Sequence, residues 1–257
     1  MAEATRNVAC TGATPIAITD CLNFGNPDKP HVYWQLEECI KGMAKACKTL
    51  GVPVISGNVS LYNESQGEPI YPTPIVGALG LIDEVSKACS AGFKAEGDEV
   101  YIIGPAATEL AGSEYLDLIH KKIAGKPKIS LTMERRVQRF IIEAIKQGLL
   151  KSAHDCSDGG LAVALAECSI LTGVGFRWSL RMKGRADVNL FGEGQSRVVV
   201  STSADKSVEL AKLTERFHVP ITKLGVTGGK FFSLGTRIKL SVEKLTHAYE
   251  TGLAAGQ

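Results

Sequence analysis

The stretch Pro15-Ile-Ala-Ile-Thr-Asp20-Cys-Leu-Asn-Phe-Gly-Asn-Pro27 joins an apolar run to a group of turn-forming residues. The apolar run predicts a strand that ends near Asp20, and Gly, Asn and Pro after it predict a loop. A carboxylate at that point could coordinate magnesium or accept hydrogen bonds from a nucleotide. Asp is also common in turns that bind nothing, so the residue type alone favours the turn interpretation without excluding the site.

A second polar stretch follows a short apolar run at residues 52–55. It reads Ser56-Gly57-Asn58-Val59-Ser60. Gly57 would let the backbone approach a ligand closely, and Asn58 and Ser60 offer oxygen atoms for a magnesium ion or a hydrogen bond. On spacing alone, a polar turn between two strands is the favoured account.

Two further polar stretches lie in the second half of the chain. In His154-Asp-Cys-Ser-Asp-Gly-Gly160, two glycines at a predicted helix start expose backbone N–H groups that suit a phosphate. The alternative is that Ser157 or Asp158 caps the helix. In Phe191-Gly-Glu-Gly-Gln-Ser-Arg197, a flexible turn presents Glu193 and Gln195, and an ordinary polar connection is favoured there.

The order of predicted helices and strands favours an α+β fold, because strict βαβ alternation is absent. Residues 32–50 carry apolar side chains at steps of three and four, which predicts a helix ending at Gly51 with Tyr33 and Trp34 as packing residues. Small and charged residues at 84–98 are typical of a linker. We therefore expect two domains, residues 1–90 and 91–257.

The composition excludes several classes of function. Lys and Arg number 29 against 27 Asp and Glu, so no basic surplus is available to bind nucleic acid. No apolar run is long enough for a membrane-spanning helix, and the N-terminal residues do not resemble a signal peptide. Seven cysteines without a C-x-x-C pair indicate reduced thiols and a cytoplasmic protein. The five histidines show no spacing that suggests a metal site.

Taken together, the four stretches resemble the large synthetase subunit family of phosphoribosylformylglycinamidine synthase. The resemblance is carried by Thr19–Pro27 and Ser56–Glu64, with support from Gly112–Tyr115, His154–Leu161 and Leu190–Glu193. It implies an aminoimidazole ribonucleotide synthetase-like fold, with a partial N-terminal α/β domain followed by a C-terminal α+β domain. The family has two tandem copies of this domain pair, and the chain is similar to most of the second copy.

The resemblance also implies a reaction. The family uses ATP to join glutamine-derived ammonia to formylglycinamide ribonucleotide, giving formylglycinamidine ribonucleotide, ADP and phosphate. By match to the family's motifs, Asp20 and Gly57 are expected to contact ATP, Asn58 to bind Mg²⁺ and Ser60 to contact the substrate. The expected phosphate or auxiliary nucleotide site comprises Asp155, Ser157, Asp158, Gly159, Gly160, Glu193 and Gln195.

No catalytic residue is expected in this chain, because the family's catalytic histidines lie in the first copy. The chain alone is therefore expected to be inactive and to need the remaining N-terminal half, a glutaminase subunit and a small accessory subunit. Absent opening strands would leave an unpaired sheet edge that self-association could cover. Gly194 stands where related domains commonly carry Ser, and Ala111 replaces a glycine, which weakens the expected ligand contacts of the C-terminal domain.

Two other functions stay open at this point. The chain could be a nucleotide-stabilised structural half that never completes an active site. It could also be a relative of selenophosphate synthetase or thiamine monophosphate kinase. The last is disfavoured, because those relatives are not expected to carry the motifs at residues 23–27 and 58–62.

Overall fold

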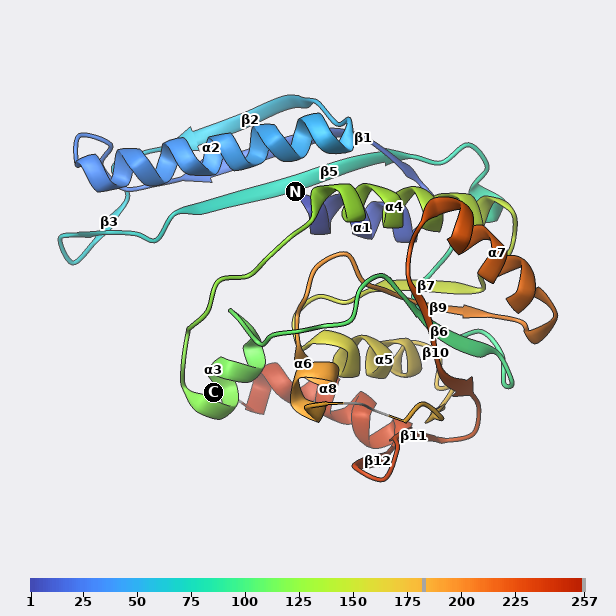
Figure 1. The fold of residues 1–257 in the computed structure, drawn as a ribbon. Helices are drawn as coiled ribbons and strands as arrows, with labels where there is room; N and C mark the ends of the chain where they lie inside the picture. Colours follow the sequence, from blue (N-terminus) through green and yellow to red (C-terminus); the bar gives the residue numbers. More distant parts are fainter. Residues whose placement is uncertain (182–183, 256–257) are drawn as a thin grey trace.

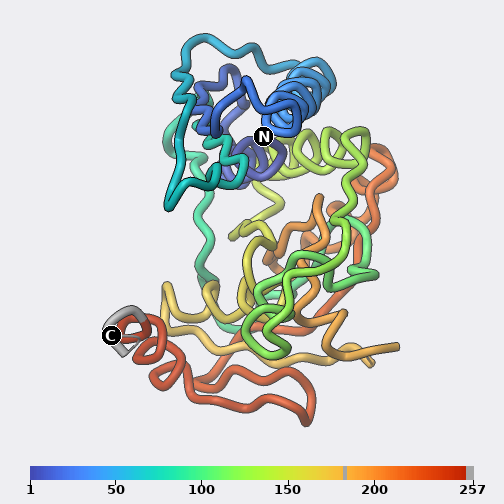
Figure 2. Tube along the Cα trace, turned by 90° about the vertical axis from the view of Figure 1, so that its left-hand side faces the viewer, coloured from blue at the N-terminus to red at the C-terminus, as the bar shows by residue number. Residues whose placement is uncertain are grey.

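The computed structural model describes residues 1–181 and 184–255, and it has the predicted α+β architecture. A small N-terminal sheet and a larger C-terminal sheet are joined through helices that pack between them (Figure 1). Figure 2 shows the N-terminal sheet and its long helix as a separate layer, with the last helix α8 (Val242–Ala255) at the opposite end of the molecule.

The N-terminal layer is a three-stranded sheet in the order β2-β1-β5. Strand β1 (Thr14–Asn23) pairs in parallel with β2 (Val54–Ser60) and antiparallel with β5 (Thr73–Leu81). The small hairpin of β3 (Glu64–Ser65) and β4 (Glu68–Pro69) lies beyond it. Helix α2 (Pro30–Leu50) runs along the sheet and ends, as predicted, at a left-handed Gly51 with φ 77°.

Asp20 and the stretch from Ser56 to Ser60 lie within strands and not in turns. Asp20 lies inside β1, and the whole segment from Ser56 to Ser60 belongs to β2. The turn favoured at residues 56–60 was wrong. The predicted strand continues past Asp20 to Asn23, and the predicted loop follows it from Phe24. The reason is the ladder between the two strands, which pairs Thr19 with Ser56 and continues to Asn23 and Ser60. These hydrogen bonds override the turn preference of Gly, Asn and Ser.

Helix α2 covers the sheet only loosely. Val32 and Ala46 are its buried residues, and Ile40 on the predicted apolar stripe is 47% exposed. Tyr33 and Trp34 are 57% and 61% exposed, so their interpretation as packing residues was wrong. Both residues belong to the first turn of α2, and neither is part of the small apolar cluster that contains Phe24 and Val32.

The C-terminal sheet has seven strands in the order β12-β11-β8-β10-β6-β9-β7. Helices cover both of its faces (Figure 1). The strands are β6 (Glu99–Ile103), β7 (Ser152–Asp155), β8 (Phe176–Trp178), β9 (Val198–Thr202), β10 (Ile221–Thr227), β11 (Phe231–Leu234) and β12 (Ile238–Ser241). The remaining helices are α1 (Ala2–Cys10), α3 (Glu114–His120), α4 (Leu131–Lys146), α5 (Gly160–Ile170), α6 (Ala186–Phe191) and α7 (Ser207–Phe217), with short 3₁₀ turns at η1 (Val85–Lys87) and η2 (Ala204–Lys206).

An apolar core lies on each face of this sheet, between the strands and the helices that cover them. One core joins α4 and α7 to the sheet through Phe140, Ile141 and Val200. The other joins α5 to the opposite face through Leu165, Phe176 and Val199. The alternation of Val198, Val199 and Val200 between the two cores is what a strand buried on both faces requires. Apolar residues at helical spacing in 137–145 and 161–168 predict a buried stripe on each of α4 and α5, and the structure confirms both stripes.

The seven cysteines are all unpaired, and Cys10, Cys156 and Cys168 are buried. Burial raises the pKa of the Cys156 thiol to about 11. Since the thiolate is the reactive form, only about one Cys156 thiol in a thousand would be ionised at pH 8. We expect iodoacetamide at that pH to label Cys156 at least tenfold more slowly than the half-buried Cys21, as read by peptide mass spectrometry. Equal labelling rates in the folded chain would contradict the buried position of Cys156.

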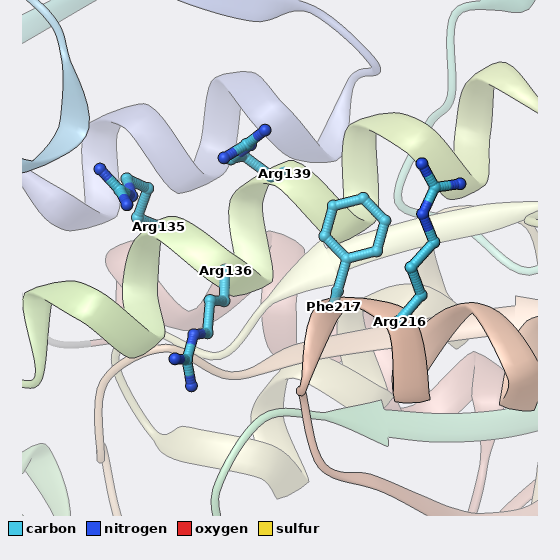
Figure 3. A pocket seen from close by; sticks show the side chains of 5 residues that line it. All are labelled: Arg135, Arg136, Arg139, Arg216 and Phe217. Carbon is cyan, nitrogen blue, oxygen red and sulfur yellow. The ribbon is translucent and has the colours of Figure 1, made fainter.

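A shallow arginine-lined hollow of about 300 Å³ lies between α4 and α7. It is lined by Arg135, Arg136, Arg139, Arg216 and Phe217 (Figure 3). Figure 3 shows Arg135 and Arg139 on one side of α4 and Arg136 pointing to the other. In the part of the chain that the structure describes, these four arginines form no ion pair with a carboxylate.

The spacing of Arg135 and Arg139 places two like charges one helical turn apart, which destabilises a helix by a few tenths of a kcal/mol. We therefore expect Arg139→Glu to stabilise the chain by about 0.5 kcal/mol, because repulsion is replaced by attraction. Urea unfolding at low and high salt measures this, and the gain should shrink at high salt. A gain of the same size from Arg237→Glu, on an exposed turn elsewhere, would show that net charge and not this pair is responsible.

None of the helices in the described part of the chain combines the length and the apolar character needed to cross a membrane.

Candidate functional site

Asp20 and Gly57 meet beside a hollow between α2 and the N-terminal sheet. The hollow has a volume of about 710 Å³, within the range of small-molecule sites. Its walls are mostly apolar side chains of α2 and β2, with Asp20 and Lys48 as the charged groups. One wall is the apolar stripe of α2, which faces this space instead of packing tightly on the sheet.

The pairing of β1 with β2 sets Asp20 directly opposite Gly57. A Cβ atom built on Gly57 would lie 2.1 Å from Asp20 Oδ1, so the carboxylate occupies the space that a side chain would need. Gly57 has ordinary strand geometry, and its φ is not positive. Glycine is therefore required here for steric reasons, because it leaves room for the Asp20 carboxylate over the strand.

Asn58 and Ser60 lie on the opposite face of the sheet. Asn58 pairs with Cys21, and Ser60 pairs with Asn23. Because side chains alternate along a strand, these residues point to the face opposite that of Asp20. Asn58 is exposed there. Ser60 Oγ accepts a hydrogen bond of 3.2 Å from the Asn63 side-chain amide, which also donates to the carbonyl of Phe24. Asp20, Gly57 and Asn58 are among the residues that line the hollow, whereas Ser60 is not.

This arrangement determines whether the residues present could hold a magnesium ion. In the described residues, no group of three or more His, Cys, Asp or Glu side chains could hold a metal. Asn58 borders the hollow as Asp20 does, but strand alternation directs the two side chains to different faces of the sheet, so their oxygens do not form a preformed pair of ligands. Mg²⁺ is usually held by one or two protein oxygens together with phosphate oxygens and water. The residues present therefore do not build a complete magnesium site by themselves.

The predicted phosphate segment in the C-terminal half contains a buried ion network. Asp155 ends β7 and is 2% exposed, and its carboxylate lies 3.5 Å from Nε of Arg6. Arg6 also pairs with Glu134 at 2.9 Å, and both side chains are fully buried. Gln195 accepts hydrogen bonds of 3.4 and 3.5 Å from the same guanidinium. Asp155 and Gln195 therefore hold α1 against the C-terminal sheet.

Glu193 lies at the start of α5, where a phosphate was expected. Its Oε1 accepts hydrogen bonds of 2.8 Å from the backbone N–H groups of Gly159 and Glu114. Burial raises the pKa of the Glu193 carboxyl above its ordinary value, and these two N–H groups partly oppose the rise. An internal carboxylate thus already binds the Gly159 amide.

The glycines at this helix start have the geometry of a tight turn. Gly159 and Gly160 have φ values of 76° and 66°, and Gly159 is the N-cap residue of α5. No side chain caps this helix, so the alternative of a Ser157 or Asp158 cap was wrong. Ser157 instead donates a 2.6 Å hydrogen bond to Asp155, and Asp158 is exposed. Asp158 is the exposed member of the expected phosphate site, and Asp155 and Gly160 are buried. The other four members, Ser157, Gly159, Glu193 and Gln195, are partly exposed.

The model of the AIR synthase related protein N-terminal domain matches residues 1–82, and that of its C-terminal domain matches residues 95–233. The chain belongs to the AIR synthase related protein family. The aminoimidazole ribonucleotide synthetase-like fold implied by the sequence motifs is thereby confirmed.

Relatives of this AIR synthase related chain carry the name of one enzyme. The chain is 44% identical over 266 residues to phosphoribosylformylglycinamidine synthase subunit PurL of an Anaeromyxobacter species, covering 99% of this chain and 35% of that protein. It is 48% identical over 231 residues to subunit PurL of Caldanaerobacter subterraneus, covering 90% of this chain and 32% of that protein. The chain thus spans about a third of the length of these relatives.

Solved structures of the family share the fold. Thermotoga maritima PurL complexed with ATP aligns with a TM-score of 0.72 and 18% identity, over 95% of this chain and 40% of that one. The same protein complexed with FGAR aligns with a TM-score of 0.75 and 19% identity, over 95% of this chain and 42% of that one. At 18% and 19% identity, the structural similarity is evidence for the fold alone.

Sequence reasoning missed three residues that the structure places at or near these sites. They are Arg6 and Glu134 of the buried network and Lys48 beside Asp20. Arg6 and Glu134 are 128 positions apart, and each sits in an ordinary helical pattern. No local signal could have paired them.

Proposed function

We propose that this chain is part of an ATP-dependent ligase that converts formylglycinamide ribonucleotide, glutamine-derived ammonia and ATP to formylglycinamidine ribonucleotide, ADP and phosphate. The observation that carries the proposal is the Asp20 carboxylate over Gly57 beside a 710 Å³ hollow. This geometry occurs in a chain 44% identical to a phosphoribosylformylglycinamidine synthase subunit. Thermotoga maritima PurL, which has the same fold, has been obtained complexed with ATP and with FGAR.

In this proposal Asp20 and Gly57 contact ATP, with Lys48 close enough to the hollow to neutralise part of the phosphate charge. Asn58 supplies one oxygen to a magnesium ion whose other ligands are phosphate oxygens and water. Ser60 contacts the substrate from the face of the N-terminal sheet to which Asn58 also points. No residue of this chain is assigned as a general acid or base.

The wider assignments follow the same proposal. The domains divide at residues 90 and 91, in the irregular segment between β5 and β6. The remaining half of the synthetase, a glutaminase subunit and a small accessory subunit complete the enzyme. Unpaired cysteines and a near-neutral charge suit a cytoplasmic location. Self-association through the exposed edge strands β2 and β5 would cover their apolar residues, among them Ile55, Val59 and Leu79.

Complementation tests the proposed reaction. The chain is mixed with the part of Caldanaerobacter subunit PurL that lies outside the 231 matched residues, and ADP release is followed with ammonia and formylglycinamide ribonucleotide. We expect no turnover from either piece alone and measurable turnover from the mixture. Turnover by this chain alone would refute the assignment of catalytic groups to the other part, and an inactive mixture of folded, associated pieces would refute the ligase proposal.

A second candidate is a nucleotide-binding structural half without turnover. The observation that favours it is the set of internal contacts at the phosphate segment, where Glu193 binds the Gly159 amide and Arg6 binds Asp155. Under this alternative, ADP raises the melting temperature of the chain while the mixture described above stays inactive. Under the ligase proposal, ADP raises the melting temperature and the mixture turns over.

A further inference from the structure

A second hollow lies within the C-terminal domain, away from Asp20. Its volume is about 320 Å³, at the lower end of the range for small-molecule sites. It lies over strands β6, β8 and β10 and is bounded by the first turn of α5, by α6 and by the loop after β6. The apolar side chains that line it are Ile102, Pro105, Ala106, Ala107, Leu161, Trp178, Leu180 and Leu224.

Arg197 places a positive charge in the wall of this apolar hollow. Its side chain is 2% exposed, and Nη1 donates a 2.8 Å hydrogen bond to the Gly192 carbonyl. Nε has no hydrogen-bond partner. Within residues 1–181 and 184–255, no carboxylate forms an ion pair with this guanidinium.

A buried guanidinium without a counter-charge is an unusual arrangement. Removing an ion from water costs several kcal/mol unless an opposite charge and hydrogen bonds compensate it. The contrast with Arg6 is direct, since that equally buried arginine pairs with two carboxylates. The surroundings of Arg197 are also apolar, because burial raises the pKa of the nearby Cys156 thiol to about 11 although the Arg197 charge opposes the rise.

We propose that this hollow binds a small organic acid, with its carboxylate on Arg197 and its apolar or aromatic body against Trp178, Leu161 and Leu224. A carboxylate matches the flat edge of a guanidinium and would give Nε its missing acceptor. A single negative charge neutralises the one buried cation, whereas a phosphate dianion would carry an excess charge into an apolar space. Arg181 also lines the hollow, but it is exposed and solvent screens it. This site does not depend on the proposed ligase function.

Tryptophan fluorescence gives a direct test, because the chain has two tryptophans and one of them lines the hollow. Trp34 is exposed on α2 and lies outside the hollow, so Trp34→Phe leaves Trp178 as the single reporter. Benzoate is the probe, since it joins one carboxylate to one aromatic ring. We expect a saturable fluorescence change with a Kd of about 1 mM, the affinity typical of so small a ligand. Benzamide, which has the same shape without the charge, is expected to bind at least tenfold more weakly.

Two variants in the Trp34→Phe background separate ligand binding from structural effects. Arg197→Met removes the charge while keeping an unbranched side chain, and should weaken benzoate binding at least tenfold without lowering the melting temperature. Thr222→Phe changes an exposed residue of β10 that lines the hollow, and should weaken binding by a similar factor through occlusion. Arg237→Met, on a distant exposed turn, is the matched control and should bind benzoate as the parent does.

Three results would overturn the proposal. They are the absence of a saturable response to benzoate, equal affinity for benzoate and benzamide, and equal affinity in the parent and in Thr222→Phe. If Arg197→Met does not fold, the comparison of Thr222→Phe with Arg237→Met still decides the question, because neither change disturbs the core.

Discussion

Replacing Arg6 with methionine is expected to destabilise the chain by about 3–5 kcal/mol, the usual cost of removing one partner from a buried ion pair. Arg6 lies in α1 and is fully buried between Glu134 of α4 and Asp155 of β7. Without it, the Glu134 and Asp155 carboxylates stay buried and lose the guanidinium that both contact. The Ser196 hydroxyl and the Gln138 amide still donate to Glu134, but they carry no charge.

Urea unfolding measures this loss, with Arg237→Met as the matched control. Arg237 is exposed, so the same substitution there should change the free energy of unfolding by no more than about 0.5 kcal/mol. A loss below about 1 kcal/mol for Arg6→Met would mean that the network does not hold α1 on the C-terminal domain. The double variant Arg6→Met with Glu134→Met should be more stable than Arg6→Met alone, because it removes one of the two orphaned charges.

Replacing Gly57 with valine is expected to weaken ADP binding by about a hundredfold, if the site beside Asp20 holds the nucleotide. A Cβ at this position would lie 2.1 Å from Asp20 Oδ1, so the carboxylate must leave its place over the strand. Such a loss corresponds to about 2.7 kcal/mol, comparable to losing a charge-assisted contact together with close backbone approach. Isothermal titration calorimetry with ADP and magnesium gives the affinity.

Gly42→Val provides the matched control for this change. Gly42 lies on α2, and a Cβ there would meet no atom within 4 Å. The substitution is expected to leave ADP affinity within about twofold, because valine is a better helix former than the glycine it replaces. If Gly57→Val keeps the affinity of the unchanged chain, Asp20 is free to move and does not contact the nucleotide from its place over Gly57.

The sequence was a good guide where one local signal dominated. The apolar steps along α2 and the glycine after it predicted the helix and its left-handed end at Gly51. The buried stripes of α4 and α5 were predicted in the same way. Asp20 and Gly57 were identified as candidate site residues, but Gly57 was predicted in a turn because residue preference was the only signal available. Pairing with a distant strand outweighed that preference.

The features of the site that could not be predicted from the sequence depend on long-range contacts. Whether Asp20 and Asn58 share a face depends on the register of β1 against β2, which includes an irregularity between Ile18 and Thr19. A shift of one residue would exchange the faces. The contacts of Asp155 depend on Arg6, which lies more than half the length of the chain away in sequence. Such charge partners are brought together by the packing of the whole fold, and no residue spacing near Arg6 or near Asp155 predicts the pair.

Calorimetric titration of the chain with ADP and Mg²⁺, repeated with Asp20→Ala and Asn58→Ala, tests the proposed nucleotide site most directly. We expect saturable binding by the unchanged chain and an affinity at least tenfold lower in each variant, because Asp20 contacts the nucleotide and Asn58 contacts its metal. Ser203→Ala, on a distant surface turn, should bind as the unchanged chain does. Unchanged affinity in both Asp20→Ala and Asn58→Ala, or no binding by the unchanged chain, would contradict a nucleotide site on strands β1 and β2.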